Sequence, residues 1–540
     1  MIIYFSIFSR DFVPMLEVSL HSLLKLGLNH KIYAGLSNLH QHDLNILKYG
    51  YPTVTFIDES DIHLKKNRLH SYKASQKLQR WKNFYDQYPV DGDYILFCDA
   101  DLIFYGDFGV LIDKESNLMI TKNEGRFMVN TGVVGMKKCC STSTFFEQWV
   151  SKNSEVLSNK KFYQQANEIS GGADQHSLIE VLNLQRVSCK GIDEIIAEPD
   201  SPIKIQIISG DLINKTKSSP VTKESRIYHV KSGFHRILLK RGSYTKLRSE
   251  KSSKEIVNLW EGLYQEAKSQ SIKRFIMSIL YENTNRFDLS NEKYLPNGIF
   301  MSEMFMILSL VVSLKIDLVV ESGRGSGFST EILCKYLNPY GVKIISIERD
   351  RSEFQNEVSR RLQKFTNLEL LFGDSIKILP KIIKRHSQQK IGILIDGPKG
   401  YNAVKTLKKL IIKNEKIIVG IIHDMRKLDL GKPSSSRFYL ENEFDRTIFS
   451  DDNDFVQEIR FMDDSVWLHN YENSLDNWRP YTKGFQFVGS YGPTLGIVFP
   501  TVRDLYGKKL QRAIDLLKER APQIISVYSW KRRIKKLFIK

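Results

Sequence analysis

The sequence contains little cysteine, and its cysteines do not form a metal-binding pattern. There are five among 540 residues, an odd number, and no two of them have C-x-x-C spacing. A disulfide framework needs paired cysteines and a cysteine-based zinc site needs closely spaced ones, so both are excluded. We expect reduced, mostly buried thiols at Cys98, Cys139, Cys140, Cys189 and Cys334.

Long hydrophobic runs are also absent. No apolar stretch approaches the roughly 18 to 20 residues that cross a bilayer. The chain passes from Met1 directly into "IIYFSIF", without a basic region or a small-residue cleavage site, so no signal peptide is predicted. These features favour a cytoplasmic protein.

Low-complexity tracts and convincing repeats are missing as well. The apolar content of 42% and charged content of 26% are ordinary for globular chains, so extensive disorder is not expected. A single hydrophobic core rarely organises 540 residues. We therefore expect two or more folded domains.

The charge is unbalanced, with a formal net value of +18. This balance indicates an anionic partner, which would be nucleic acid, a membrane surface or a phosphate-bearing substrate. The segment 529–540, "SWKRRIKKLFIK", carries six basic residues and no acidic one, which leaves about +12 for the rest. Its apolar residues recur at helical spacing. It is either a basic amphipathic helix on the anionic inner membrane surface or a solvated helix packed on its own domain.

Strand and helix patterns alternate through the first half. The runs "MIIYFSIFSRDF", "HKIYAGLSN" and "PTVTFIDES" predict strands, and "VPMLEVSLHSLLKLG" and "YKASQKLQRWKNFYDQY" predict helices. This alternation is typical of a mainly parallel α/β sheet. In such sheets ligands bind at the carboxyl ends of the strands.

Two aspartates follow a buried strand of this half. The run "DYILF" is apolar on both faces, and "CDADL" places Asp99 and Asp101 at its carboxyl end, where residues i and i+2 of an extended chain share one side. Two carboxylates that close repel each other unless a cation lies between them. A divalent ion bridging a diphosphate is the natural candidate, and a solvated turn is the alternative.

Two later segments add polar residues to this picture. "RFMVNTGVVGMK" holds Asn130, Thr131 and Gly132 inside an apolar strand, and "ISGGADQHSLIEVL" precedes a helix with Gly171, Gly172, Asp174 and Gln175. Together with "CDAD", these residues resemble the GT-A glycosyltransferases, especially the family 8-like enzymes that use UDP-sugars. The resemblance covers about the first 240 residues.

The resemblance implies roles for these residues. The D-x-D holds manganese or magnesium and the diphosphate of a nucleotide-sugar. The Asn130-Thr131-Gly132 strand lines the sugar pocket, and the Gly171-Gly172 loop presents Asp174 and Gln175 to the donor and acceptor. Asp174 is expected to orient the sugar or the acceptor.

The same family has a late metal-binding histidine followed by glycine and a basic residue. Here "IYHVKSGFHR" offers His229, then Lys231, Gly233 and Arg236, with a spacing that departs from the family pattern. Either Lys231 or Arg236 would neutralise the diphosphate, and the alternative for His229 is a strand-end histidine. Further candidates for contact with the phosphates or the base are Lys73, Lys77 and Arg80. The alternative is that they are solvated residues on a helix surface.

A second α/β pattern follows a lysine- and serine-rich helical stretch. "IDLVVESGRGSGFSTEILCKYL" reads as a strand, a glycine loop and a helix, and "VKIISIERD" is a strand that ends on an acid. Glycines let the backbone turn sharply near a nucleotide-like ligand, and Glu348 would bind ribose hydroxyls. The spacing is G-x-G-x-G, not the G-x-G-x-x-G of NAD-binding folds. The glycines are Gly323, Gly325 and Gly327, preceded by Glu321.

This E-x-G-x-G-x-G arrangement resembles the class I S-adenosylmethionine (SAM) methyltransferases. The resemblance covers roughly residues 297–500. It implies that the loop approaches the methionine part of SAM, that Glu348 holds the ribose, and that Asp374 in "FGDSIKILP" lies near the adenine.

The next motif resembles the cation-dependent catechol-type O-methyltransferases. "KIGILIDGPKG" contains Asp396 and Lys399, and "IIVGIIHDM" contains Asp424. In that family an aspartate and an aspartate-asparagine pair bind magnesium, and the lysine deprotonates the acceptor hydroxyl. Here Met425 stands where the asparagine would be. A thioether is a poor magnesium ligand, so metal binding would need His423 or water to take its place. Lys399 would act as a base if burial lowered its pKa, and the alternative is a surface-turn lysine.

The predicted fold class is α/β, with two Rossmann-like domains. The boundaries we predict are a GT-A domain at 1–240, a helical connector at 241–296, a methyltransferase domain at 297–500 and a basic tail at 501–540. The predicted function is bifunctional: metal-dependent transfer from a nucleotide-sugar to a glycan or glycolipid, and SAM-dependent O-methylation of a sugar hydroxyl, in polysaccharide biosynthesis. No nucleic-acid partner is expected. The alternatives are an RNA- or protein-directed methyltransferase with a recruiting N-terminal domain, and a glycosyltransferase with a degenerate methyltransferase-like domain.

Overall fold

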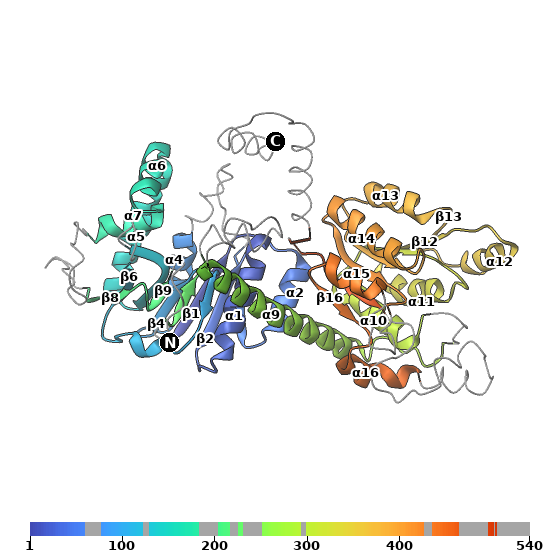
Figure 1. The fold of residues 1–540 in the computed structure, drawn as a ribbon, viewed down its shortest axis with the longest axis horizontal. Helices are drawn as coiled ribbons and strands as arrows, with labels where there is room; N and C mark the ends of the chain where they lie inside the picture. Colours follow the sequence, from blue (N-terminus) through green and yellow to red (C-terminus); the bar gives the residue numbers. More distant parts are fainter. Residues whose placement is uncertain are drawn as a thin grey trace. The chain divides into compact units, whose positions relative to one another are not determined.

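The chain forms two compact α/β units (Figure 1). The computed structural model describes residues 1–59, 77–122, 129–182, 203–215, 225–230, 251–292, 299–425, 435–463, 495–501 and 503–504. The first unit comprises Met1–His235 and Thr245–Glu282, and the second comprises Arg236–Tyr244 and Asn283–Lys540. Each unit has its own seven-stranded sheet.

The large sheet of the first unit is parallel except at one strand. Its order is β3-β2-β1-β4-β7-β6-β8, and β7 runs antiparallel to both β4 and β6. A small second sheet has the order β5-β10-β9. The strands are β1 (Ile2–Ile7), β2 (Lys31–Leu36), β3 (Val54–Asp58), β4 (Tyr94–Cys98), β5 (Leu102–Phe104), β6 (Leu118–Lys122), β7 (Val129–Lys137), β8 (Ile205–Ser209), β9 (Ile213–Lys215) and β10 (Ile227–His229).

Both faces of this sheet are buried, which explains the continuous apolar runs in its central strands. Along β1, Ile3 and Phe5 pack into a cluster with α1, whereas Ile2 and Tyr4 pack into a cluster with α4 and α5. The helices of the unit are α1 (Val13–Lys25), α2 (Gln41–Gly50), α4 (Lys77–Gln87), α5 (Cys140–Ser158), α6 (Lys160–Ile169), α7 (Ala173–Val181) and α9 (Lys251–Asn283), with short 3-10 turns η1 (Arg10–Phe12) and η2 (Gly109–Leu111).

Helix α9, drawn in green in Figure 1, lies within the segment predicted as a connector. Its residues up to Glu282 belong to the first unit. Ser271 Oγ donates a hydrogen bond to Glu17, and Arg274 donates to the carbonyl of Gly50 at 2.9 Å. Most of this helix therefore packs onto the first unit.

The second unit has a doubly wound sheet of order β13-β12-β11-β14-β15-β17-β16. Its first five strands are parallel, and β17 is antiparallel to β15 and β16. The strand order reverses between β11 and β14, the place where such sheets bind ligands. The strands are β11 (Leu318–Ser322), β12 (Lys343–Glu348), β13 (Leu368–Phe372), β14 (Ile391–Ile395), β15 (Ile417–Ile422), β16 (Thr447–Phe449) and β17 (Gly496–Val498).

Helices follow most strands of this sheet, as the alternating pattern predicted. They are α10 (Met301–Ser313), α11 (Phe328–Leu337), α12 (Glu353–Leu362), α13 (Ser375–Arg385), α14 (Tyr401–Lys413), α15 (Ser435–Glu443) and α16 (Asn453–Ile459), with 3-10 turns η3 (Asn338–Tyr340) and η4 (Arg460–Asp463). The core includes buried aliphatic residues of β11, β12, β14 and β15.

The predicted fold class is confirmed: both units are α/β with largely parallel sheets. The domain boundaries stay a prediction, and nearly all of the predicted 501–540 tail lies outside the described residues. Among the described residues, no helix is long and apolar enough to span a membrane. The expectation of mostly buried thiols holds for Cys98 and Cys334, whereas Cys140 is exposed and Cys139 half-buried.

Candidate functional site

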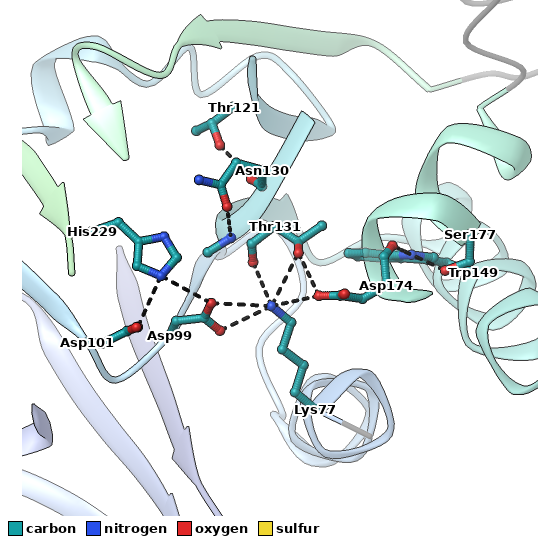
Figure 2. A network of polar contacts seen from close by, with 11 residues as sticks. Lys77, Asp99, Asp101, Thr121, Asn130, Thr131, Trp149, Asp174, Ser177 and His229 are labelled. Carbon is teal, nitrogen blue, oxygen red and sulfur yellow. Dashed lines mark hydrogen bonds and ion pairs between the residues drawn. The ribbon is translucent and has the colours of Figure 1, made fainter. Parts of the chain in front are cut away.

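The D-x-D lies between two strands of the first unit (Figure 2). Asp99 follows β4, and Asp101 precedes β5, which pairs antiparallel with β10 and so brings His229 opposite Leu102. His229 Nε2 lies 3.1 Å from Asp101 Oδ1 and 3.7 Å from Asp99 Oδ2. The D-x-D pair and a histidine from a distant part of the sequence thus converge.

These three side chains fit a divalent cation. One ligand atom from each of Asp99, Asp101 and His229 lies within 4.8 Å of the other two. Two carboxylate oxygens and one imidazole nitrogen are donors that suit Mn²⁺, and the oxygens suit Mg²⁺. They would hold the cation at the carboxyl end of β4.

Strand β7 brings the Asn130-Thr131-Gly132 segment to the same place. Because β7 is antiparallel to β4, its beginning lies beside the end of β4, and the Asp99 amide donates to the carbonyl of Gly132 at 2.8 Å. Asn130 Oδ1 accepts the Gly132 N–H at 3.1 Å. Thr131 Oγ1 donates to Asp174 Oδ2 at 2.6 Å.

Lys77 forms the centre of this network, as Figure 2 shows. Its side chain is 8% exposed, and Nζ lies 3.1 Å from Asp99 Oδ1 and 2.8 Å from Asp174 Oδ2. It also donates to the Thr131 carbonyl at 3.0 Å. Burial alone would lower the pKa of Lys77, but the two carboxylates raise it overall. Lys77 is therefore a buried ammonium bound to two acids, which corrects the picture of a surface lysine available to a phosphate.

The loop before α7 holds Asp174 in this position. Trp149 Nε1 donates to the Asp174 carbonyl at 3.0 Å, and the Gln175 amide donates to the carbonyls of Val129 and Ser170. Burial would raise the pKa of Asp174, but attraction to Lys77 and hydrogen bonds from Lys77 and Thr131 lower it overall. The pKa of Asp99, by contrast, is raised by burial.

Glycine is required at the two positions of this loop by different constraints, one conformational and one steric. Gly171 has φ +85°, a left-handed conformation. At Gly172 a Cβ would lie 2.7 Å from Asp174 Oδ1, so a side chain there would displace the carboxylate.

The remaining phosphate candidates divide into two groups. Arg80 is fully buried and binds Glu59 Oε2 and Ser37 Oγ, each at 2.8 Å, so it holds β2 and β3 to α4 and is not available to a phosphate. Lys73, Lys231 and Arg236 lie outside the described residues.

In the second unit, the predicted glycine loop joins β11 to α11. Gly323 has φ +93°, and a Cβ there would lie 2.7 Å from the Gly397 nitrogen, so only glycine lets the ends of β11 and β14 meet. Gly325 has φ +53° and nothing within 4 Å of its Cβ position, which leaves room for a ligand. Gly327 is the N-cap residue of α11.

Glu321, at the end of β11, supports the glycine loop through hydrogen bonds. It is fully buried, and its carboxylate accepts hydrogen bonds from Ser329, Thr330 and Ser346, at 2.5, 2.5 and 2.7 Å. Burial raises its pKa. Glu321, a cofactor-binding candidate as part of the E-x-G-x-G-x-G motif, thus ties β11 to α11 and β12.

Glu348 and Asp374 lie at the ends of the next two strands. Glu348 Oε2 accepts the N–H groups of Arg324 and Gly325 at 3.1 and 3.0 Å, so it is joined to the glycine loop. Asp374 is exposed and caps α13 by accepting the Ile376 N–H. The ribose contact of Glu348 and the adenine contact of Asp374 stay predictions.

The acids of the third motif converge after β14 and β15. His423 Nδ1 lies 2.7 Å from Asp396 Oδ1, and Lys399 Nζ contacts Asp396 and lies 2.6 Å from Asp424 Oδ2. Asp424 has φ +64°, a strained conformation for a residue other than glycine.

The charges of this cluster stabilise one another. Burial would raise the pKa of Asp396, but His423 and Lys399 lower it to about 2. Burial would lower the pKa of His423, but Asp396 and Glu303 raise it to about 10. The pKa of Lys399 is likewise raised by Asp396 and Asp424, against the effect of burial. The direction predicted for Lys399 as a base is therefore wrong.

Two residues of this site were not predicted from the sequence. Glu303 on α10 is 1% exposed, and its carboxylate lies 3.6 Å from His423 Nε2. The sequence feature that could have identified it is a single acid in an apolar helix. Arg324 lies within the glycine loop, 2% exposed, with its guanidinium 4.9 Å from the Phe372 ring centroid.

Comparisons with known proteins give distant structural likenesses. The sequence matches no protein-family model and no curated protein. The glycosyltransferase GlyE of Streptococcus pneumoniae TIGR4 is 14% identical over 76% of this chain and 88% of its own, with a TM-score of 0.33. The galactosyltransferase LgtC, in complex with donor and acceptor sugar analogs, is 11% identical over 49% and 96%, with a TM-score of 0.31.

The O-methyltransferase TomG of Streptomyces achromogenes, in complex with SAM, is 14% identical over 41% of this chain and 89% of its own, with a TM-score of 0.26. At these scores the likenesses add no argument to the strand orders and site geometry above.

Proposed function

We propose that the chain is a bifunctional glycan-modifying enzyme. Its first unit transfers a sugar from a nucleotide-sugar, most simply a UDP-sugar, to a glycan or glycolipid. Its second unit transfers a methyl group from SAM to a sugar hydroxyl. The convergence of Asp99, Asp101 and His229 beside the Lys77–Asp174 pair carries the first activity.

The residues of the first unit have complementary roles in this proposal. Asp99, Asp101 and His229 hold Mn²⁺ or Mg²⁺, which when bound stabilises the negative charge of the leaving diphosphate. Lys77 fixes the direction of Asp99 and Asp174 with one ammonium group. Thr131 further orients Asp174, which positions the donor sugar or the acceptor hydroxyl.

The second activity is supported by the glycine loop at the switch point of its sheet. Gly323, Gly325 and Gly327 all have left-handed backbone conformations, and Glu348 follows the neighbouring strand β12. This arrangement provides a close backbone approach for the methionine part of SAM and an acid for the ribose. The basic segment 529–540 is proposed to hold the chain to an anionic membrane.

The first activity is tested with UDP-, GDP- and dTDP-sugars plus Mn²⁺, with nucleotide release as the readout. We expect one donor class to be turned over and EDTA to stop the reaction. Asp99→Asn and Asp101→Asn should each reduce turnover at least about 100-fold, the scale of losing one stabilising group at a charge-developing site. Asp91→Asn, an exposed aspartate of the same unit, is the matched control. Full turnover by both variants would refute the metal assignment.

The second activity is tested by SAM binding in a thermal melt. A bound ligand stabilises the folded state by about 2.7 kcal/mol at a hundredfold excess over its dissociation constant. We expect SAM to raise the melting temperature of the wild type and to have a smaller effect on Gly325→Val, whose side chain would enter the open space above the loop. An unshifted melt of the wild type would favour the degenerate second domain.

A further inference from the structure

We propose that the second unit uses a built-in cation, the ammonium group of Lys399, where the catechol-type methyltransferases use a divalent metal ion. This inference rests on the proposed methyltransferase function of that unit.

Met425 removes one ligand and does not face the acids. Its side chain is fully buried within the hydrophobic core of the second unit. A Cβ built on Gly496 would lie 2.9 Å from Met425 Cγ, so the thioether packs against β17. The side chain at position 425 therefore points into the core, and a thioether is in any case a weak donor to Mg²⁺.

Lys399 fills the space between the two remaining acids. Its Nζ contacts Asp396 Oδ1 and lies 2.6 Å from Asp424 Oδ2, so one ammonium bridges both carboxylates. A divalent ion at the same point would have to displace this ammonium, because the ion and Nζ would compete for the same oxygens of Asp396 and Asp424.

His423 occupies a further donor position. Its Nδ1 lies 2.7 Å from the same Asp396 Oδ1, and its other nitrogen faces Glu303 at 3.6 Å. The imidazole is thus held between two carboxylates in the wall of the site, 5% exposed. One ligand atom from each of Asp396, His423 and Asp424 lies within 4.8 Å of the other two, as in the first unit. Here, however, Lys399 and His423 already neutralise the surrounding acids, so the cluster suits Mg²⁺ poorly.

This arrangement has a consequence for the acceptor. A metal ion selects acceptors that chelate it through two neighbouring oxygens, whereas Lys399 and Asp424 offer one donor and one acceptor to a single hydroxyl. The site therefore suits an isolated alcohol, such as one hydroxyl of a glycan, and does not require a vicinal diol. Methyl transfer forms the oxygen–methyl bond, breaks the sulfur–methyl bond and leaves the electron pair on sulfur, and the hydroxyl proton passes to the Asp424 carboxylate that accepts its hydrogen bond.

The test is Mn²⁺ binding to the full-length chain, measured by the loss of the free-ion electron paramagnetic resonance signal. The double variant Asp99→Asn/Asp101→Asn removes the first-unit cluster and is expected to bind no Mn²⁺ at millimolar concentration. Adding Lys399→Met should create one site per chain, and adding Asp424→Asn should abolish it again. Lys399→Gln is a second variant should Lys399→Met fail to fold, and Lys405→Met on α14 is the matched control.

Two results would overturn the inference. One is a Mn²⁺ site in the Asp99→Asn/Asp101→Asn protein that Asp424→Asn removes. The other is a folded Lys399 variant, by circular dichroism, that gains no site. Because the readout is ion binding, a lack of methyl transfer alongside the expected Mn²⁺ results would count against the proposed function alone.

Discussion

At the residue scale, both candidate sites place a lysine between two carboxylates, but in different surroundings. The Lys77 side chain is 8% exposed and that of Lys399 is 52% exposed. Losing one partner of a buried ion pair leaves uncompensated charge in a poorly solvated place, whereas an exposed pair contributes little because water screens it. Lys77 is therefore important to stability as well as to the site, and Lys399 mainly to the site.

Lys77→Met should lower the free energy of unfolding of the first unit by about 3 kcal/mol or more, because Asp99 and Asp174 lose their shared cation. The measurement is urea unfolding followed by circular dichroism. Lys82→Met on the same helix is the control, since its partner Asp86 is 48% exposed, and should cost under about 1 kcal/mol. Equal losses in the two variants would contradict the buried bridge.

The pH dependence of the second unit should follow His423. Its pKa is raised to about 10 in the folded chain, against about 6.5 in an unfolded chain. The charged imidazole therefore stabilises the fold fully below about pH 6.5, and this contribution is lost as the pH rises through about 10. The stability advantage of wild type over His423→Gln should shrink between pH 6.5 and 10 by an amount on the order of a few kcal/mol.

Thermal melts across that pH range provide the measurement. His386→Gln, at the C-cap of α13, is the control substitution. A difference between wild type and His423→Gln that stayed constant with pH would show that the imidazole is not held charged by Asp396 and Glu303.

The sequence predicted the residues of both sites better than their contacts. The D-x-D and the glycine loop are local patterns, because a strand end and a tight turn fix their geometry within a few residues. The Lys77 bridge depends instead on how α4 packs against β4, β7 and α7, which composition and spacing do not reveal. The sequence placed Asp396, Lys399 and Asp424 in one motif, but it did not show that the ammonium would lie directly against both carboxylates, whose charge raises the pKa of Lys399.

At the element scale, the orientation of one strand assembles the first site. A wholly parallel sheet would place the beginning of β7 at the edge away from the end of β4. Because β7 is antiparallel to β4, Gly132 meets Asp99 directly. The alternating pattern predicted a mainly parallel sheet but did not show which strand is reversed.

The contact of α9 with α2 gives a prediction at the same scale. A Cβ on Gly50 would lie 2.5 Å from Ser271 Cβ and 2.9 Å from its Cα, so Gly50→Ala should push the helix away and cost about 1–3 kcal/mol. Gly262 lies within α9 with nothing within 4 Å of its Cβ position. Gly262→Ala should therefore stabilise the unit by about 0.5–1 kcal/mol. Chemical unfolding of both variants measures the difference, and a neutral Gly50→Ala would argue against the close approach.

At the scale of the whole molecule, the packing of α9 determines where the chain can be cut into fragments that fold on their own. Trp260, Tyr264 and Phe275 are fully buried, and the Phe275 ring lies 5.8 Å from that of Tyr49. Fully burying one large apolar side chain contributes about 1.5–3 kcal/mol, so a chain without α9 loses much of a typical folding free energy. The predicted boundary at residue 240 came from the extent of the GT-A resemblance and from the lysine- and serine-rich composition that follows, and neither shows which unit a helix packs against.

We predict that a fragment of residues 1–282 folds and binds Mn²⁺, whereas a fragment of residues 1–240 exposes the face that α9 covers and aggregates. Size-exclusion chromatography and binding of a hydrophobic dye measure the difference. In the longer fragment, Trp260→Ala should cost about 3–5 kcal/mol, and the exposed Tyr281→Ala on the same helix should cost little. If residues 1–240 were monomeric and as stable as residues 1–282, α9 would be a connector after all. If both fragments aggregated, the first unit would need the second to fold, and the two activities would be inseparable.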